Sequence, residues 1–141
     1  MVSRSDKFTI HDKKIQQFSD FTTSFAKNPL TGFLARVTNE DAIKQSIKNL
    51  VLTERTERFY RPWIGSKIMS LLFEPMDAPT QEMMKNAITE TIKNNEPRVD
   101  LKLVEVIPHQ DINAYVINVH FKIKNIPDSL ETMNLILRRT R

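Results

Sequence analysis

Residues 80–107, TQEMMKNAITETIKNNEPRVDLKLVEVI, contain the helix, the corner and the strand that decide the fold. Apolar residues in the first half recur at three- and four-residue spacing, on one face of a helix: Met84, Ala87, Ile88 and Ile92. Residues 99–107 are rich in β-branched and apolar side chains and predict a strand. Pro97 stops the helix and disfavours helical backbone at Glu96. Glu96, Pro97 and Arg98 therefore form a stiff corner between two packed elements.

The composition indicates an ordinary folded domain. Of the 141 residues, 40% are hydrophobic and 27% are charged, which is enough apolar surface for a modest core. The net charge of +4 is compatible with an acidic partner but does not demonstrate nucleic-acid binding. Cysteine is absent, which excludes disulfides and thiolate metal sites. We expect neither a secretory signal nor a membrane span, because the chain lacks apolar runs of the required length.

The first 38 residues differ from the rest of the chain. Their apolar side chains are scattered among Ser, Thr, Lys and Asn without a sustained period, and Asn28, Pro29 and Gly32 indicate a turn. Four of the eight Phe residues lie within the first 25 positions, so this segment has apolar surface to bury. We expect an extended N-terminal arm over residues 1–38, laid along the domain or along a neighbouring subunit. A disordered tail is the alternative. Residues 39–141 are expected to form a single domain.

Two more helices are predicted before the corner. Asn39 is expected to cap a helix that runs to about Leu52. Residues 53–62 are charged and irregular, which suits a hairpin or an extended loop. Gly65 and Ser66 are then expected to open a short helix that is buried nearly all round.

Two more strands are predicted after the corner. The second strand alternates apolar residues with polar ones, the apolar set being Tyr115, Ile117, Val119, Phe121 and Ile123. A last strand alternates Met133, Leu135 and Leu137 with polar residues, and turns are expected at 108–111 and 125–129. The predicted fold is therefore α+β, with two or three helices packed on one face of a three-stranded antiparallel sheet.

No catalytic centre, metal site or cofactor site is predicted. Glycine occurs only twice, which excludes the usual phosphate-binding loops, and the three His residues stand alone without a second ligand at metal spacing. A glycosidase needs two carboxylates at a suitable separation. The available pairs are Glu54/Glu57, Glu74/Asp77 and Glu90/Glu96. Seventeen acidic residues produce such pairs by chance, so we expect no enzyme.

The segment 53–63 combines basic and aromatic residues and predicts a binding surface: Arg55, Arg58, Phe59, Tyr60, Arg61 and Trp63. Arginine and aromatic side chains together can stack on bases and pair with phosphates. The same residue types are enriched at protein interfaces, which is the interpretation we favour.

Three motifs occur in the order of a known family. They are residues 42–50 (AIKQSIKNL), Gly65-Ser66 leading to residues 71–75 (LLFEP), and residues 95–99 (NEPRV). Together they resemble the baseplate wedge and sheath-initiator family of contractile-tailed bacteriophages, over residues 39–138. The turn at 28–32 further resembles members from large phages related to the T-even group.

The resemblance implies a structural subunit of the virion, in the tail baseplate, assembled in the host cytoplasm. Its expected partners are the other baseplate wedge proteins and the tail sheath subunits, with the tail tube or hub as further neighbours, in several copies around a sixfold baseplate. Neither nucleic acid nor membrane is an expected partner. Relatives occur in type VI secretion baseplates and other contractile injection devices, which is the nearest alternative. Some members carry a lysozyme-like name, so a peptidoglycan-degrading enzyme is a lower alternative.

The resemblance also assigns candidate binding residues. The family's Glu-Pro-Arg motif maps onto Glu96, Pro97 and Arg98 and is associated with binding the wedge core; simple helix punctuation is the alternative. Arg58 and Trp63 are expected to contribute to the same contact. The family commonly has a Gly in the hairpin followed by Arg-Pro-Phe, whereas residues 53–62 contain no Gly, so the contacts of Arg58 are less secure.

A second surface is expected at the edge of the sheet. Family members present a sheet edge onto which the first ring of sheath subunits is built. An exposed strand offers unpaired backbone N–H and C=O groups to an incoming strand. We therefore expect the last strand, through Met133, Leu135 and Leu137, to pair with an arm of a sheath subunit.

Overall fold

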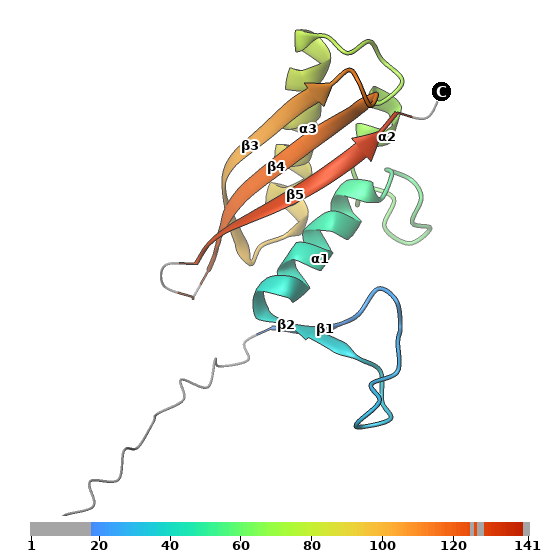
Figure 1. Ribbon diagram of the computed structural model, residues 1–141, viewed down its shortest axis with the longest axis vertical. Helices are drawn as coiled ribbons and strands as arrows, with labels where there is room; N and C mark the ends of the chain where they lie inside the picture. Colours follow the sequence, from blue (N-terminus) through green and yellow to red (C-terminus); the bar gives the residue numbers. More distant parts are fainter. Residues whose placement is uncertain (1–17, 125, 127–128, 140–141) are drawn as a thin grey trace, which may run out of the picture.

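The computed structural model describes residues 18–124, 126 and 129–139, and over these residues the fold is α+β, as predicted (Figure 1). The helices are α1 (Asn39–Leu52), α2 (Ile68–Leu71) and α3 (Ala78–Asn95). The strands are β1 (Ser19–Phe21), β2 (Arg36–Thr38), β3 (Val99–His109), β4 (Ala114–Ile123) and β5 (Leu130–Arg138). The predicted first strand thus extends two residues further than expected, to His109, before the chain turns.

The main sheet is an antiparallel meander in the order β3-β4-β5. The alternation predicted for β4 is confirmed, because its five apolar positions from Tyr115 to Ile123 are buried while Lys122 is exposed. The register of β3 against β4 shifts between Leu101 and Leu103, as at a β-bulge. β4 lies in the centre, so β3 and β5 are the two edges of this sheet.

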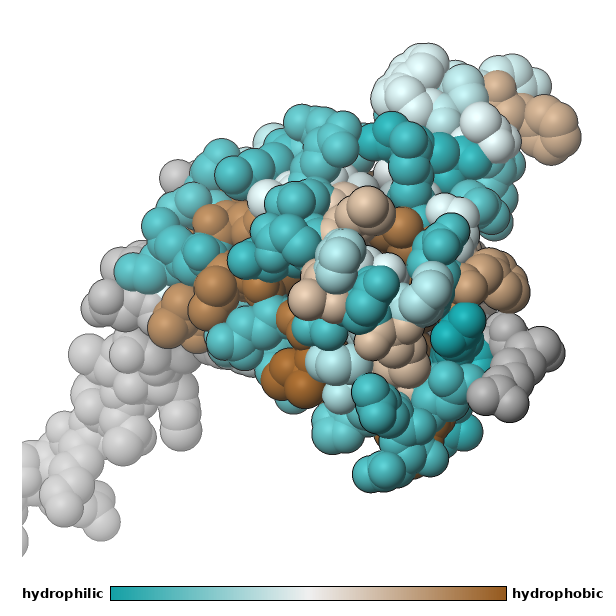
Figure 2. Space-filling view, turned by 90° about the horizontal axis from the view of Figure 1, so that it is seen from above, coloured by the Kyte–Doolittle hydropathy of each residue, from teal (hydrophilic) through white to brown (hydrophobic). Residues whose placement is uncertain are grey.

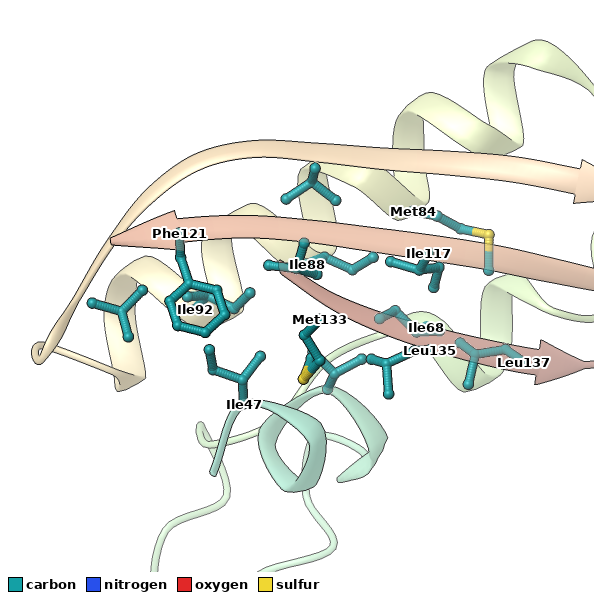
Figure 3. Packing of buried hydrophobic residues seen from close by; sticks show 14 of the residues in the cluster. Ile47, Ile68, Met84, Ile88, Ile92, Ile117, Phe121, Met133, Leu135 and Leu137 are labelled. Atoms are coloured by element: carbon teal, nitrogen blue, oxygen red, sulfur yellow. The ribbon is translucent and has the colours of Figure 1, made fainter. Parts of the chain in front are cut away.

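The hydrophobic core lies between the sheet and the helices (Figure 3). α3 packs behind the sheet and places Met84, Ile88 and Ile92 on its buried face, as their spacing predicts. α1 adds Ile47 beside Met133 of β5 (Figure 3). Burying each such side chain contributes about 1.5–3 kcal/mol relative to leaving it in water. These contacts fix the orientation of α3, and hence of the corner at its C-terminal end.

The start of α1 differs from the prediction. The N-cap is Thr38, without a side-chain hydrogen bond, and Asn39 has a positive φ of 48°. The Asn39 Oδ1 atom instead accepts a hydrogen bond of 3.3 Å from the backbone N–H of Phe18. The prediction of Asn39 as the cap is therefore wrong, and its side chain binds the incoming chain at Phe18.

Residues 19–38 contain a structure that the sequence pattern did not predict. β1 and β2 pair antiparallel, with Ser19 opposite Thr38, so the chain folds back on itself before entering α1. The side chain of Gln45 on α1 binds this unit twice, as it donates to the Phe21 carbonyl at 2.6 Å and accepts from the Thr23 N–H at 3.2 Å. The first 17 residues of the expected arm lie outside the described residues.

The second helix is shorter and less buried than predicted. α2 spans four residues, and although Ile68 is buried, Met69 and Phe73 are exposed. Apolar patches interrupt the mostly hydrophilic face seen in Figure 2. In the part of the chain that the structure describes, none of the helices combines the length and apolarity that crossing a membrane requires.

Candidate docking site

The corner is closed by an internal ion pair. Arg98 donates from Nε to Glu96 Oε1 at 2.6 Å and from an Nη atom to Glu96 Oε2 at 2.7 Å, which makes the contact bidentate. The hydroxyl of Ser46 on α1 donates to Glu96 Oε2 at 2.6 Å. Glu96 is only 3% exposed, so this buried carboxylate has the charged and polar partners that burial demands.

Arg98 also connects the corner to the N-terminal segment. Its guanidinium carbon lies 5.6 Å from the centre of the Phe18 ring, within the range of a cation–π contact. Its backbone carbonyl accepts from the N–H of Lys124 just beyond β4, at 2.9 Å. The corner therefore joins four segments: residue 18, α1, the end of α3 and the sheet.

The partners of Glu96 decide its protonation. Burial by itself would raise the pKa of Glu96, but the hydrogen bonds from Arg98 and Ser46 and the charge of Arg98 outweigh it and lower the pKa. Among the interactions that lower the pKa of Glu96, the hydrogen bond from Arg98 has the largest effect. Glu96 is consequently ionised at neutral pH, as a permanent member of the ion pair.

This pKa shift predicts the acid stability of the protein. Because the pKa of Glu96 is lower in the folded than in the unfolded state, the pair stabilises the fold fully above the unfolded pKa. That stabilisation is lost as the pH falls through the folded pKa. Glu96→Gln is expected to flatten the pH dependence below about pH 4.5 in urea unfolding. An unchanged slope between pH 5 and pH 2.5, relative to the wild type, would contradict the assignment.

The geometry separates the three predicted corner residues. Glu96 points inward, and Arg98, with its side chain 32% exposed, presents only its outer edge to a partner. Pro97 is exposed. Glu96 orients Arg98 through the bidentate pair, and both Glu96 oxygens accept hydrogen bonds from donors within the chain.

The segment between α1 and α2 is an extended loop with a tight base. The Ser66 N–H donates to the Thr53 carbonyl at 2.8 Å, and the Ser66 hydroxyl donates to the Val51 carbonyl at 2.6 Å. Gly65 has a φ of +133°, and a Cβ there would lie 2.6 Å from the Thr53 carbonyl oxygen and 2.8 Å from that of Glu54. Only glycine fits a backbone this close to its neighbour.

The base of the loop is held against α3. Arg55 pairs with Glu90 at 3.1 Å, and the Thr91 hydroxyl, which donates to the Ala87 carbonyl at 2.8 Å, also lies 3.3 Å from the Gly65 carbonyl oxygen. Glu96 is the C-cap residue of α3, five residues after Thr91. α3 therefore contacts the loop base and leads directly into the corner.

The tip of the loop exposes aromatic side chains to solvent. Phe59 is 96% exposed, Tyr60 95% and Trp63 67%, and Arg58 and Arg61 beside them are also exposed. Large apolar side chains on a surface mark interaction sites when they cluster. We call these five residues the aromatic tip. It includes the predicted Arg58 and Trp63, and Phe59 and Tyr60 are the most exposed of its three aromatic residues.

The residues predicted for strand addition face away from a partner. Met133, Leu135 and Leu137 are buried in the core. The Arg139 N–H donates to the Asn113 carbonyl, so these two residues form a hydrogen-bonded pair. Hydrogen-bonded and non-hydrogen-bonded pairs alternate along an antiparallel ladder. Met133, Leu135 and Leu137 therefore also direct their backbone groups to β4. These three residues therefore contact the core and β4, and the pairing of β5 with a sheath subunit stays a prediction. The open edge of β5 is formed by the backbone groups of the residues between them: Thr132, Asn134, Ile136 and Arg138.

Two contributors to the corner carried no clear signal in the sequence. Ser46 lies on a helix face as an ordinary polar residue, 50 positions before Glu96. Phe18 belongs to a segment without periodicity, and its ring contact with Arg98 joins residues 80 positions apart. Only the three-dimensional fold brings them to the corner.

At least one carboxylate in each of the three available pairs has a structural role. Glu57 accepts from the N–H of Glu54, Asp77 caps α3 through the N–H of Thr80, and Glu90 pairs with Arg55. Within residues 18–124, 126 and 129–139, no group of three His, Cys, Asp or Glu residues is placed to hold a metal ion.

Comparisons with known proteins agree with this architecture. A family described as baseplate wedge protein gp25 matches residues 37–128. The baseplate wedge protein gp25 of Enterobacteria phage T4 is 30% identical over 96 residues, which cover 68% of this chain and 73% of the T4 protein.

Two solved structures share the fold. A Geobacter sulfurreducens protein with the provisional name of tail lysozyme is 25% identical with a TM-score of 0.58, covering 70% of this chain and 86% of its own. A chain in the baseplate of the anti-feeding prophage is 22% identical with a TM-score of 0.60. The match covers 88% of this chain and 87% of the prophage chain. Because the match at residues 37–128 includes the corner, the loop, β3 and β4, this chain belongs to the baseplate wedge protein gp25 family.

Proposed function

We propose that this chain is a structural, non-enzymatic subunit of the baseplate of a contractile phage tail. The observation that carries the proposal is the aromatic tip, which is almost fully exposed on a loop whose base is bound tightly to α1 and α3. A rigid loop loses little conformational entropy on binding. Arginine and aromatic residues are also the side chains that most often dominate interface energies.

The proposed partner of the tip is the core of the baseplate wedge. This assignment is supported by family membership and by the chain in the anti-feeding prophage baseplate, whose fold is similar. The corner has a supporting role in this proposal. Its ion pair holds α1, α3 and the N-terminal segment together, and Pro97 and the outer edge of Arg98 are exposed there as a separate contact.

The second proposed partner is the tail sheath. The edge of β5 directs the backbone groups of Asn134 and Ile136 outward, and their side chains lie on the solvent face of the sheet. An arm of a sheath subunit that pairs with this edge would gain main-chain hydrogen bonds. Copies repeated around a sixfold baseplate would then set the starting register of the first sheath ring.

The acidic residues do not support the lysozyme-like alternative. A glycosidase needs a carboxylic acid that is protonated near its working pH, so its pKa must be raised. Glu96 is the buried carboxylate among the described residues, and its pKa is shifted in the opposite direction. We therefore propose that the chain has no peptidoglycan-degrading activity.

The wedge role is tested by removing the aromatic tip. The double variant Phe59→Ser/Tyr60→Ser is expected to fold normally and to lower incorporation into baseplates at least tenfold, since two anchors at about 1–2 kcal/mol each are lost. Quantitative mass spectrometry of purified particles measures the incorporation.

A matched control removes two exposed apolar residues elsewhere. Phe73→Ser/Ile112→Ser changes side chains at the end of α2 and in the β3–β4 turn, and it should enter baseplates at the wild-type level. Equal incorporation of both double variants would contradict the proposed docking surface.

A further inference from the structure

The edge of β3 differs from that of β5 because a groove runs beside it. The groove has a volume of about 540 Å³. One wall is the first half of α3, and the other is the strand itself from Leu103 to Ile107. The α3 wall consists of Ala78, Gln81, Glu82 and Lys85.

The backbone groups that point into this groove can be identified. The N–H of Lys124 donates to the carbonyl of Arg98, so the even-numbered residues of β4 bond to β3. Their partners Leu103, Glu105 and Ile107 therefore direct their backbone N–H and C=O groups to β4. Val104 and Val106 therefore direct their N–H and C=O groups to the open edge. Pro108 is the next residue of this set, and its missing N–H marks the end of the edge.

The side chains beside these groups set the chemistry of an incoming strand. Leu103, Glu105 and Ile107 lie on the solvent face of the sheet, where Leu103 and Ile107 are exposed apolar residues. Glu105 has an exposed side chain with weak contacts, 3.4 Å from the Asn118 amide and 4.0 Å from His120. The pattern along the edge is thus apolar, acidic, apolar.

We propose that the β3 edge is a second strand-addition site, which binds an extended partner segment with a basic residue between two apolar ones. In antiparallel pairing, the basic residue lies opposite Glu105 in a narrow pair, where side chains approach most closely. The two apolar residues lie opposite Leu103 and Ile107. The intervening side chains face Gln81, Glu82 and Lys85 across the groove and are small and polar.

This site does not depend on the proposed role in the sheath. It lies on the opposite edge of the sheet from β5, and its occupant is defined by the charge and the apolar residues of β3. If both edges are occupied, the three-stranded sheet becomes the centre of a five-stranded one that joins two partner chains.

The test uses the full chain and a synthetic probe, the peptide Ser-Thr-Val-Thr-Lys-Thr-Val-Thr-Ser. Binding is measured by fluorescence anisotropy, and amide hydrogen exchange followed by NMR reports which backbone groups become protected. The Lys peptide is expected to bind about fivefold more tightly than the same peptide with Glu at its centre. Protection should appear at Val104 and Val106.

The variant Glu105→Lys supplies the matched control. It changes one exposed side chain, keeps the backbone edge, and should reverse the preference in favour of the Glu peptide. The proposal is overturned if the Lys peptide does not bind at millimolar concentration, or if protection falls on Asn134 and Ile136 instead. Protection of Val104 and Val106 without peptide would also overturn it, because another part of the chain or a second copy would then occupy the edge.

Discussion

Gly65→Ala is expected to lower the free energy of unfolding by about 2–4 kcal/mol and to remove the subunit from assembled baseplates. The added Cβ would meet the backbone oxygens of Thr53 and Glu54 at 2.6 and 2.8 Å, and backbone atoms cannot move aside as a flexible side chain can. The φ of +133° is a second cost for any residue with a Cβ. Urea denaturation of the purified variant measures the loss of stability.

The other glycine of the chain is the matched control. Gly32 also has a positive φ, of 73°, but the nearest atom to an added Cβ is the Lys27 Cε at 3.7 Å. Gly32→Ala should therefore cost only about 1–2 kcal/mol, from the backbone conformation alone. Equal losses of stability in the two variants would show that the close backbone approach at Gly65 does not add to the cost of the positive φ.

Asn134→Pro is expected to give baseplates that contain the subunit but do not carry a sheath. Its N–H points to the open edge of β5 and its side chain is exposed, so proline removes one outward donor without emptying the core. Leu135→Pro would not test the same idea, because Leu135 is buried and its N–H faces β4.

Asn134→Ala is the control for this prediction. It removes the same side chain and keeps the N–H, so sheath assembly should remain near the wild-type level in electron micrographs of purified tails. Sheathed tails in normal number from Asn134→Pro would argue against strand addition at β5.

Much of the fold could be predicted because local patterns and tertiary packing agree. β4 lies in the centre of a half-solvated sheet, and its alternation appears directly as buried and exposed positions. α3 has one apolar face and is stopped by Pro97, so both its buried side and its end follow from the sequence. The corner was recognisable for the same reason.

The remaining features depend on contacts that are distant in sequence. Glu96 binds Ser46, 50 residues upstream, and Arg98, two residues downstream. The sequence spacing suggests only the contact with Arg98. β1 and β2 are three residues each, too short for a periodic signal. Asn39 is a residue type that often caps helices, but its side-chain oxygen accepts from the Phe18 N–H. Phe18 lies beside Asn39 only in the folded chain.

The residues that the alternation of β5 identifies are not those whose backbone groups lie at its open edge, and the reason is geometric. Apolar alternation identifies the residues that face the core, and in this strand the same residues also bond to β4. The groups available to a partner belong to the polar or exposed set between them, such as Asn134. Sequence alternation alone does not show which set bonds inward, because that depends on the register with the neighbouring strand.

A cryo-electron microscopy structure of the assembled baseplate that contains this chain would test the proposed wedge role best. Phe59, Tyr60 and Trp63 should be buried against wedge-core proteins in every copy, and the Glu96–Arg98 pair should be intact. A baseplate in which the chain is present and these three aromatic side chains remain in solvent would contradict the central claim.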